Sequence, residues 1–482
     1  MITTTSNFDS IHNLAYKKPL YSIRFHQGPY SFPYTFGSIV FGSGSEERGT
    51  HLSNGVIQQP LYDESDAPIL DEDGEAIFDA PTHYSFLKSI SGGTQNVSPT
   101  EGRASISGLS ATFLDQDDTI TSMFPYDGVS NLHRTEVTVK AGYQGVNFSD
   151  FVTIFTGWVT GCKMTDNLGS YVFSITDPQK WLQKYVARNA TSDAPVYYTG
   201  NPINIILQIL CSTGERSNGT YDFRSAANGC AIDQALVNIS EMESIRDKYY
   251  PGDSHYLRII CTERIKAKDL IENEILKVLN CYPKIDGHGR YSIIPFQPPT
   301  TDDDTPSIGE SDIIGLPTWD ANLMSLRNEI EFKHDYDPDD GDFDEITYYS
   351  DGDSINARGQ GNDQISIESK GLHLSHAPAS SPSRAATIMK RRKQVAFTRW
   401  ATPPIKISFK TFFTKWILEA GDIIKFSHPQ VPDIVAGTRG ITDVPMEVVK
   451  RSVDWTRGIV SFTVLDTGFR KDNPLEDVLT AA

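Results

Sequence analysis

Apolar and polar residues alternate along two short segments that lie far apart in the 482-residue chain. Gly169–Asp177 and Gly458–Asp466 each begin with a glycine, place apolar side chains at alternate positions and close on an aspartate. Alternation with a period of two, bounded by Gly and Asp, is typical of a half-buried β-hairpin. The segments Gly161–Leu168 and Lys450–Arg457 supply the opposing arms. The repetition predicts two related β-domains, although a run of this kind also arises by chance in a β-rich chain.

Further strands are predicted around both copies. Before the first copy, the pattern predicts a strand over Phe151–Phe155 and an edge-like strand over Phe155–Val159. From Gly102 to Asp115 the apolar side chains change parity at Gly108, which predicts one long strand with a β-bulge at that glycine. Four more strands are predicted near the C-terminus, around residues 405–414, 422–426, 446–453 and 458–465.

Apolar residues at helical spacing predict four helices. Asp177 as N-cap and Pro178 at the first position predict the start of one helix. Asn201 and Pro202 precede a second helix. The other two helices show the apolar spacing of an amphipathic helix. A hairpin is predicted directly after the third of the four helices. The last three helices are predicted over Ile203–Leu210, Glu263–Asn280 and Pro382 to about Thr398.

These patterns predict a mainly β protein with an α+β insertion. The predicted division is an arm over residues 1–16, a first β-domain over 17–192 with a loop insertion at 42–83, an α+β middle domain over 193–315, a second β-domain over 316–470 and a tail over 471–482.

The charge balance bears on the possible partners. Lys and Arg number 43 and Asp and Glu number 62, which gives a net charge of −19. This sign disfavours nucleic-acid binding, which relies on cations that neutralise phosphates. The negative charge suits the wall of a channel past which DNA slides without binding, and a contribution to solubility explains the charge equally well. The five cysteines are scattered, which predicts reduced and mostly buried thiols. No apolar run approaches the ~18 residues of a membrane helix, and the N-terminus has no signal-peptide pattern, so we expect folding in a cytoplasm.

The sequence offers little chemistry of a catalytic kind. The acidic segment Asp335–Glu345 does not match the calcium loop of an EF-hand, because glycine falls at the seventh position and Ile346 at the twelfth. We interpret it as a solvated turn, with adventitious Ca²⁺ left open. His373 and His376 are interpreted as surface residues. No nucleophile elbow, phosphate loop or zinc-protease motif is present. We therefore predict no catalytic residue, cofactor or metal ligand, and no enzymatic activity.

One basic run stands out in this acidic chain. Lys390, Arg391, Arg392 and Lys393 follow one another within the predicted helix that begins at Pro382. An exposed helix face explains such a run. The alternative is a docking site for an acidic neighbouring subunit, in which complementary charges fix the register.

Several of these segments together resemble a known family. Phe155–Asp177 resembles the first β-domain of the tail-tip or baseplate hub proteins of tailed bacteriophages. Asn201–Leu207 and Ala267–Pro295 look like the middle domain of these proteins, and Leu418–Asp466 is similar to their last, tube-like domain. The resemblance covers the chain from about residue 85 onward, and the insertion at 42–83 departs from it.

The resemblance implies a structural role in a virion. Such hubs form homotrimers in which two tube-like β-domains per chain make a ring of six units around the DNA channel. The implied partners are a distal tail or tail-tube protein, the tape-measure protein and a tail fibre or spike. DNA passes without specific binding, and the protein is made in the host cytoplasm. Two alternatives stay open, a tail-associated cell-wall hydrolase and a carbohydrate-binding virion protein.

Overall fold

The computed structural model describes most of the chain. The described residues are 19–25, 50–53, 87–115, 136–143, 150–165, 169–212, 229–251, 255–286, 288–296, 305–361, 363–375, 382–434 and 436–470. The fold is mainly β, with a half-barrel sheet and helical insertions. The predicted arm and tail lie outside the described residues, and of the predicted insertion at 42–83 only residues 50–53 are described. The predicted domain boundaries stay predictions.

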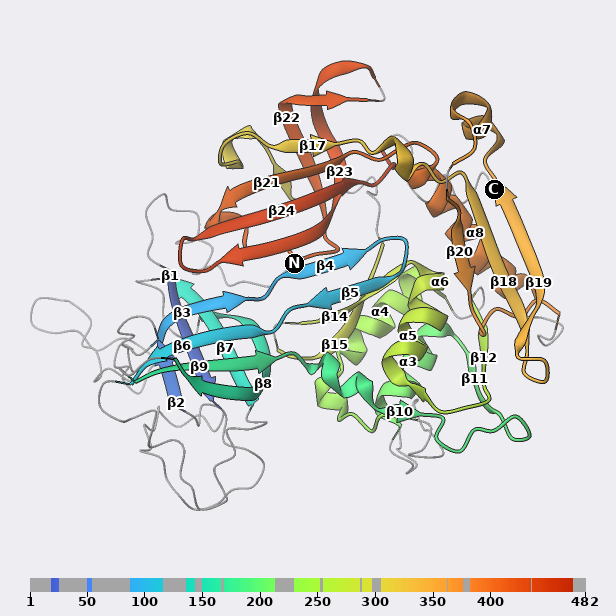
Figure 1. The fold of residues 1–482 in the computed structure, drawn as a ribbon, viewed down its shortest axis with the longest axis horizontal. Helices are drawn as coiled ribbons and strands as arrows, with labels where there is room; N and C mark the ends of the chain where they lie inside the picture. Colours follow the sequence, from blue (N-terminus) through green and yellow to red (C-terminus); the bar gives the residue numbers. More distant parts are fainter. Residues whose placement is uncertain are drawn as a thin grey trace, which may run out of the picture.

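The first sheet is antiparallel and has seven strands within the described residues (Figure 1). Its order is β2-β1-β7-β8-β9-β6-β3. Residues 151–159 were predicted as two strands, one of them edge-like. From Val152 onward they instead belong to the single long strand β8, which lies between β7 and β9. The strands are β1 (Pro19–Phe25), β2 (Thr50–Ser53), β3 (Leu87–Gly92), β6 (Leu109–Leu114), β7 (Glu136–Tyr143), β8 (Val152–Met164) and β9 (Ser170–Thr176).

The second sheet is built mainly from the C-terminal part of the chain. Its main path is β16-β22-β23-β24-β21-β17, and the hairpin of β4 and β5 joins it through β23. The four predicted C-terminal strands are confirmed, and two of them are longer than predicted. The strands are β4 (Gln95–Ser98), β5 (Arg103–Ile106), β16 (Ser307–Ile308), β17 (Thr318–Asp320), β21 (Lys406–Phe412), β22 (Ile423–Asp433), β23 (Thr438–Asp454) and β24 (Ile459–Asp466).

The chain crosses between these sheets at Gly108. The predicted single strand with a bulge is wrong, because β5 pairs with β4 whereas β6 pairs with β9 and β3. A Cβ atom at Gly108 would lie 2.5 Å from the carbonyl oxygen of Ile175, so only glycine permits this close approach. The change of parity in the sequence therefore marks a change of sheet.

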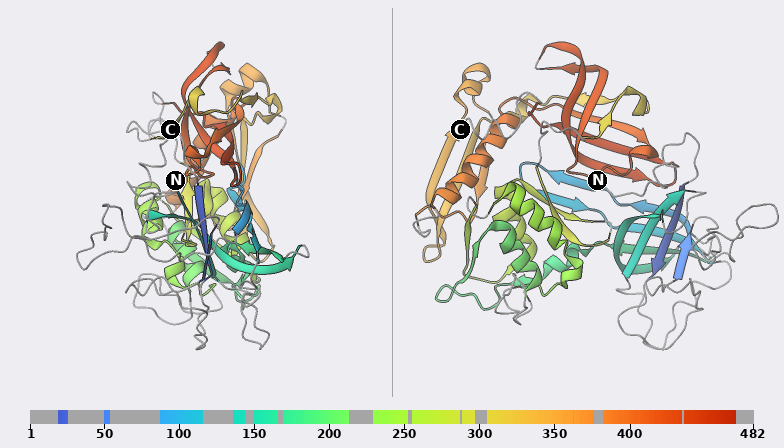
Figure 2. Two further views of the ribbon diagram at one scale, coloured as in Figure 1. Left: turned by 90° about the vertical axis from the view of Figure 1, so that its left-hand side faces the viewer. Right: turned by 180° about the vertical axis from the view of Figure 1, so that it is seen from behind.

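A helical region with short hairpins fills the space beside the two sheets (Figure 2). Asn201 accepts a hydrogen bond from the backbone of Ile203 and caps α3, as predicted. The helix predicted after Asp177 is instead a 3₁₀ segment. The helices are the 3₁₀ segment Pro178–Gln183, α3 (Pro202–Cys211), 3₁₀ Gln234–Leu236, α4 (Ile239–Tyr249), α5 (Ala267–Ile271), which continues through a π turn (Glu272–Leu276) into α6 (Lys277–Leu279), then 3₁₀ Glu310–Asp312, 3₁₀ Leu323–Ser325, α7 (Gly352–Arg358), α8 (Pro382–Trp400) and 3₁₀ Phe413–Lys415.

The remaining strands form small sheets around these helices. β18 lies between its antiparallel neighbour β19 and its parallel neighbour β20, and α8 packs beside this sheet (Figure 1). The strands are β10 (Tyr185–Val186), β11 (Val196–Gly200), β12 (Leu257–Cys261), β13 (Ile265–Lys266), β14 (Cys281–Ile285), β15 (Tyr291–Pro295), β18 (Glu329–Asp337), β19 (Asp342–Ser350) and β20 (Ile365–Glu368).

Two large hydrophobic cores and two much smaller clusters hold the described residues together. One core lies in the helical region and includes the buried face of α8. The other runs through both large sheets and contains Phe173 of the first and Phe462 of the second. Because one core serves both sheets, their burial of apolar surface stabilises them jointly. None of the helices among the described residues is long and apolar enough to cross a membrane.

Candidate functional site: the repeated unit and its junction

The two large sheets contain the same four-stranded antiparallel unit. In the first sheet the order is β7-β8-β9-β6, and in the second it is β22-β23-β24-β21. In each unit the strand that comes first in the chain, β6 or β21, lies at one side of the sheet unit, next to the strand that comes last. The other three strands lie side by side in the order of the chain. The predicted hairpins at the two repeated segments, β8 with β9 and β23 with β24, are confirmed. We call the β6–β9 set the first unit and the β21–β24 set the second unit.

The two units also share their register. Aligning Gly169 with Gly458 makes Ser174 of β9 the counterpart of Thr463 of β24. Ser174 pairs with Gly161 and Thr463 pairs with Lys450, and in both hairpins the register shifts by one residue just before that pair. A second shift follows Val139 in β7 and its counterpart Phe426 in β22. Two irregularities at matching positions are specific features of a strand pair.

Equivalent positions are buried in both units. Phe173 and its counterpart Phe462 are 1% and 2% exposed. Ile175 and Val464 are equally buried one alternate position further along each strand, as the period of two requires. The repeated pattern in the sequence therefore corresponds to the same inward face in each unit.

The ends of the repeated hairpin strands match as well. Gly169 and Gly458 have φ values of 76° and 66°, a left-handed conformation that glycine adopts without strain. At the other end, a carboxylate oxygen of Asp177 accepts from the backbone N–H of Gln179, and one of Asp466 accepts from that of Gly468. The glycine and aspartate that both segments share are thus explained by the turn at one end and the backbone cap at the other.

An aromatic seam joins the two sheets. The hydroxyl of Tyr21 donates to the carbonyl of Trp455 over 3.2 Å, and the two rings meet edge to face with centroids 5.5 Å apart. Tyr143 and Tyr21 both contact the ring of Phe413, which stacks on Trp416. Burial raises the pKa of Tyr21 well above its ordinary value, so this phenol stays protonated.

The hairpin of β4 and β5 forms the second contact between the two sheets. Gln95 and Asn96 of β4 pair with Arg451 and Lys450 of β23. The side-chain amide of Gln95 donates to Glu419 over 3.3 Å and accepts from the backbone N–H of Ala420 over 3.1 Å. The segment that follows β3, a strand of the first sheet, thereby becomes part of the second sheet.

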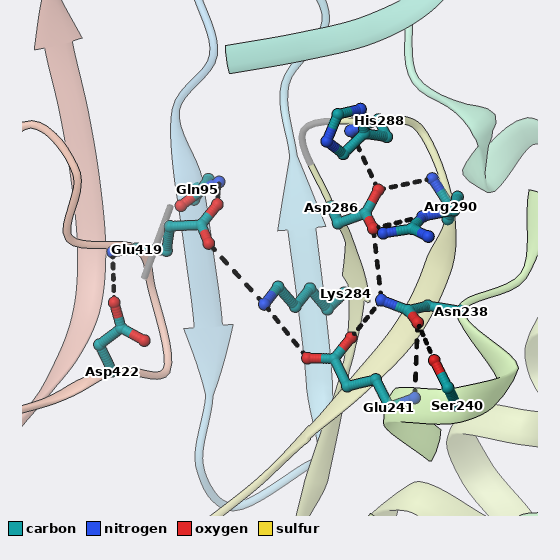
Figure 3. Close-up of polar contacts among 10 residues, drawn as sticks. All are labelled: Gln95, Asn238, Ser240, Glu241, Lys284, Asp286, His288, Arg290, Glu419 and Asp422. Atoms are coloured by element: carbon teal, nitrogen blue, oxygen red, sulfur yellow. Dashed lines mark hydrogen bonds and ion pairs between the residues drawn. The ribbon is translucent and has the colours of Figure 1, made fainter. Parts of the chain in front are cut away.

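Charged side chains connect this hairpin to the helical region (Figure 3). The ammonium of Lys284 in β14 lies 3.6 Å from a carboxylate oxygen of Glu241 in α4 and 4.0 Å from one of Glu419. Glu419 in turn bonds to Gln95, so the chain of contacts runs from α4 through β14 to β4. A neighbouring carboxylate, Asp286, pairs with Arg290 over 2.8 Å.

The electrostatics of this junction favour the charged forms. Burial alone would lower the pKa of Lys284, but Glu419, Glu241, Asp422 and Asp286 raise it above its ordinary value. Burial would likewise raise the pKa of Glu419, yet the attraction of several positive charges, Lys284 and Arg451 among them, lowers it. The junction is therefore an ionic contact that persists over the neutral pH range.

The basic run on α8 is largely engaged within the chain. Arg392 is 2% exposed, and burial lowers its pKa to about 10. Arg391 donates to the carbonyl of Tyr249, and the ammonium of Lys393 lies 5.1 Å from the centre of the Tyr349 ring. Lys390 is exposed. The side chain of Arg392 is thus unavailable at the surface. The docking role of the run stays a prediction, and Lys390 is the residue of the run best exposed for it.

Asp335 and His373 do not lie where the sequence placed them. Asp335 is 1% exposed and accepts from the backbone and hydroxyl of Ser375, while its other oxygen bonds to His334. His373 is also buried, with Nδ1 3.6 Å from Asp335. The turn itself covers only residues 338–341, because β18 ends at Asp337 and β19 begins at Asp342. His376 lies outside the described residues. Among the described residues, no group of three His, Cys, Asp or Glu is arranged to hold a metal ion.

Other contacts of the junction were missed by the sequence reasoning. Arg399 of α8 forms a fully buried ion pair with Glu447 of β23. The sequence pattern predicted a helix near Arg399 and a strand at Glu447. Neither pattern indicates that the two side chains contact each other. The prediction of mostly buried cysteines is confirmed, since only Cys162 of the five free thiols is exposed.

No protein-family model matches the chain. No curated protein matches its sequence. Solved structures that align with it include the 43 kDa tail protein of prophage MuSo2 from Shewanella oneidensis, with 10% identity over 82% of this chain and 96% of that one and a TM-score of 0.41. Prophage tail protein gp18 from Listeria monocytogenes EGD-e aligns with 11% identity, 82% and 93% coverage and a TM-score of 0.41.

A tail protein from Neisseria meningitidis MC58 aligns with 9% identity over 81% of this chain and 99% of that one, with a TM-score of 0.40. These three structures are tail proteins, the class that the sequence resembles. Because every one of these TM-scores is below 0.5, the superpositions carry no argument about function, which has to rest on the repeated unit.

Proposed function

We propose that this chain is a structural subunit of a phage tail tip or baseplate, a hub that forms a homotrimeric ring around the DNA channel. The observation that supports the proposal best is the repeated four-stranded unit, with its shared order, register and bulges. A chain with two equivalent units can present six similar positions when three copies assemble about a three-fold axis.

Such a ring adapts one symmetry to another. Its six units would continue a six-fold tail tube, formed with a distal tail or tail-tube protein, while its three chains would hold a three-fold fibre or spike. The tape-measure protein would reach the ring from inside the tube. The unequal insertions of the two units fit this role, because they give the ring a three-fold outer part without disturbing the six repeated units.

The net charge of −19 fits passage of DNA through the ring. Like charges on the wall and on the phosphates prevent adhesion, since DNA-binding proteins depend on releasing counterions with Lys and Arg. A channel surface that proved neutral or basic would contradict this part of the hypothesis.

The chemistry of the described residues supports a structural role. Charged groups that lie deep in the chain contact one another, as Arg399 does with Glu447, and Lys284 with Glu241 and Glu419. We propose no enzymatic activity on this basis. Release of fragments from purified cell walls would instead favour a tail-associated hydrolase, and binding on a glycan array would favour a carbohydrate-binding protein.

The decisive experiment is the native mass and symmetry of the purified chain. Light scattering should give three times the chain mass of 53.6 kDa, and negative-stain averaging should show a ring of six similar lobes. A monomer at all concentrations, also in the presence of its tail-tube protein, would contradict the ring.

A further inference from the structure

Among the described residues, the contact of β4 with β23 has no counterpart in the first unit. The hairpin that precedes the first unit gives a strand, β4, to the second unit at Lys450 and Arg451 of β23. If six units form a ring, each second unit also has a first unit of the next chain as its neighbour. Equivalent positions in a closed ring favour equivalent contacts. The corresponding edge of the first unit is therefore the place to look for the contact between chains.

The shared register identifies that edge. Gly161 is the counterpart of Lys450, because their partners Ser174 and Thr463 are equivalent. The segment Gly161–Met164 of β8 thus corresponds to Lys450–Val453 of β23. Residues 162–164 are exposed, and Met164 is 59% exposed although it is apolar.

Among the described residues, no strand pairs with the outer side of this segment. β7 pairs with β8 only as far as Trp158, and β9 occupies the opposite side. An open strand edge beside an exposed apolar side chain is a template for the addition of another strand.

The second unit has an insertion in the place from which the donor would come. The donated hairpin lies between β3 and β6, which are neighbours in the first sheet. Their counterparts are β17 and β21, which are also antiparallel neighbours, and the insertion between them contains β18 and β19. β19 lies at the outside of its sheet (Figure 1), so one of its edges is open among the described strands.

The side chains of β19 suit a contact with another chain. Ile346 is 46% exposed, and its neighbours Asp344 and Glu345 are also exposed. A strand with apolar and acidic side chains at the surface complements the receiving segment, where Met164 and Lys163 are exposed.

We propose that the edge of β8 at Gly161–Met164 binds the outer edge of β19 from a neighbouring copy of this chain. The contact would repeat between chains what β4 does with β23 within one chain. It rests on the proposed ring and adds the strands that close it.

Crosslinking tests this contact with a thiol that the chain already has. Cys162 lies in the receiving edge and is exposed, whereas Cys211, Cys230, Cys261 and Cys281 are buried. The variants Glu345→Cys and Ile346→Cys place a second thiol on each face of β19 in turn, since neighbouring residues of a strand point to opposite faces. A short bismaleimide is then added to the assembled protein.

The expected result is a crosslinked ladder of dimers and trimers for at least one of the two variants, with a peptide that joins Cys162 to the new thiol. Tyr197→Cys in β11, which is 48% exposed, provides the matched control and should give no ladder. Adding Cys162→Ser should abolish the ladder. Mixing isotopically labelled and unlabelled protein should show that the two peptides come from different copies.

A charge exchange provides an independent test. Lys163→Glu faces the acidic β19 with another negative charge and should raise the protein concentration at half assembly by about two- to five-fold for each contact. Asp344→Lys in the same chain should reverse much of this change. Circular dichroism should show that both variants remain folded.

The outcomes separate this proposal from the proposed function. A trimer that gives no Cys162 crosslink to β19, and whose assembly is indifferent to Lys163→Glu, would overturn the strand contact and leave the ring intact. A persistent monomer would overturn the ring, and the strand contact would fall with it.

Discussion

The first and second units share a fold but differ in what surrounds them. Phe173 and Phe462 occupy the same inward position, and both contribute to the core that the two sheets share. Trp158 and Glu447 are also equivalent, because they pair with the equivalent residues Thr176 and Leu465. In the first unit this position is a half-buried tryptophan, whereas in the second it is a fully buried glutamate.

The difference at that position follows from α8. The helix brings Arg399 to Glu447, so the second unit can bury a carboxylate that has a cationic partner. The first unit has no helix in the corresponding place among the described residues, and an aromatic side chain lies there instead. Inward positions are thus constrained by the common core, whereas outward positions depend on the insertion that each unit carries.

The largest expected effect tests whether the two units share one core. Phe173→Ala and Phe462→Ala should each lower the free energy of unfolding by about 3–5 kcal/mol, because each leaves a cavity among packed rings. Urea unfolding should show one transition in both variants, with matching shifts of the midpoint. Phe→Leu at each position is the milder control. Two separate transitions, with only one shifted in each variant, would mean that the units are stable independently.

The next effect concerns the charge that distinguishes the second unit. Glu447→Gln should cost about 3–5 kcal/mol of folding free energy, because the buried guanidinium of Arg399 loses its counter-charge. The double variant Arg399→Met with Glu447→Met should recover most of this loss, since it removes both charges. A single variant as stable as the double one by urea unfolding would contradict the pairing.

A smaller effect is expected at the hairpin that connects the units. Gln95→Ala removes the acceptor for the backbone N–H of Ala420 and the donor to Glu419. The cost should be about 1–3 kcal/mol, the usual range for leaving a buried group unpaired. Hydrogen exchange of the Ala420 amide should accelerate accordingly. Asn96→Ala, one residue further along β4, keeps both bonds and should leave that amide protected.

The junction should also respond to acid. The lowered pKa of Glu419 contributes stability that is present above its unfolded value of about 4.5 and is lost as pH falls through the folded value. The raised pKa of Lys284 contributes stability below about 10.5, lost as pH rises through the folded value. Urea midpoints measured from pH 7 to 3 should fall less steeply for Lys284→Met than for the unsubstituted chain. Equal slopes would place the acid sensitivity elsewhere.

The smallest effect on stability is expected at the surface of α8. Lys390→Glu should change the free energy of unfolding by less than about 0.5 kcal/mol, because the side chain is exposed. Arg392→Met, two residues along the same run, should change it more, since Arg392 is buried. If the run docks on an acidic subunit, Lys390→Glu should weaken assembly in light scattering. Unchanged assembly would remove the docking prediction.

Local features of the fold were predictable from the sequence. The start of α8 at Pro382 and the cap of α3 at Asn201 depend on residues next to the helix, so the pattern revealed both. The two glycine-to-aspartate segments were recognisable because turns and alternation are encoded within a few residues.

Features that depend on distant partners were not predictable. The burial of Arg392 follows from packing against parts of the chain far from α8, such as Thr100, whose carbonyl accepts from its guanidinium. Asp335 looked like part of an acidic turn because its partner Ser375 lies 40 positions away. The register that makes Gly161 equivalent to Lys450 exists only once the strands have paired.

The crossing at Gly108 has a mechanical consequence. Residues 103–106 belong to the second sheet and residues 109–114 to the first, so only Ser107 and Gly108 separate two hydrogen-bonded segments. Both are held in place, Ser107 by the carbonyl of Thr94 and Gly108 by the backbone N–H of Gly93. So short a connection does not allow one sheet to rotate relative to the other. We therefore expect a rotation of one sheet to carry the other with it, so that the two sheets move as one rigid body.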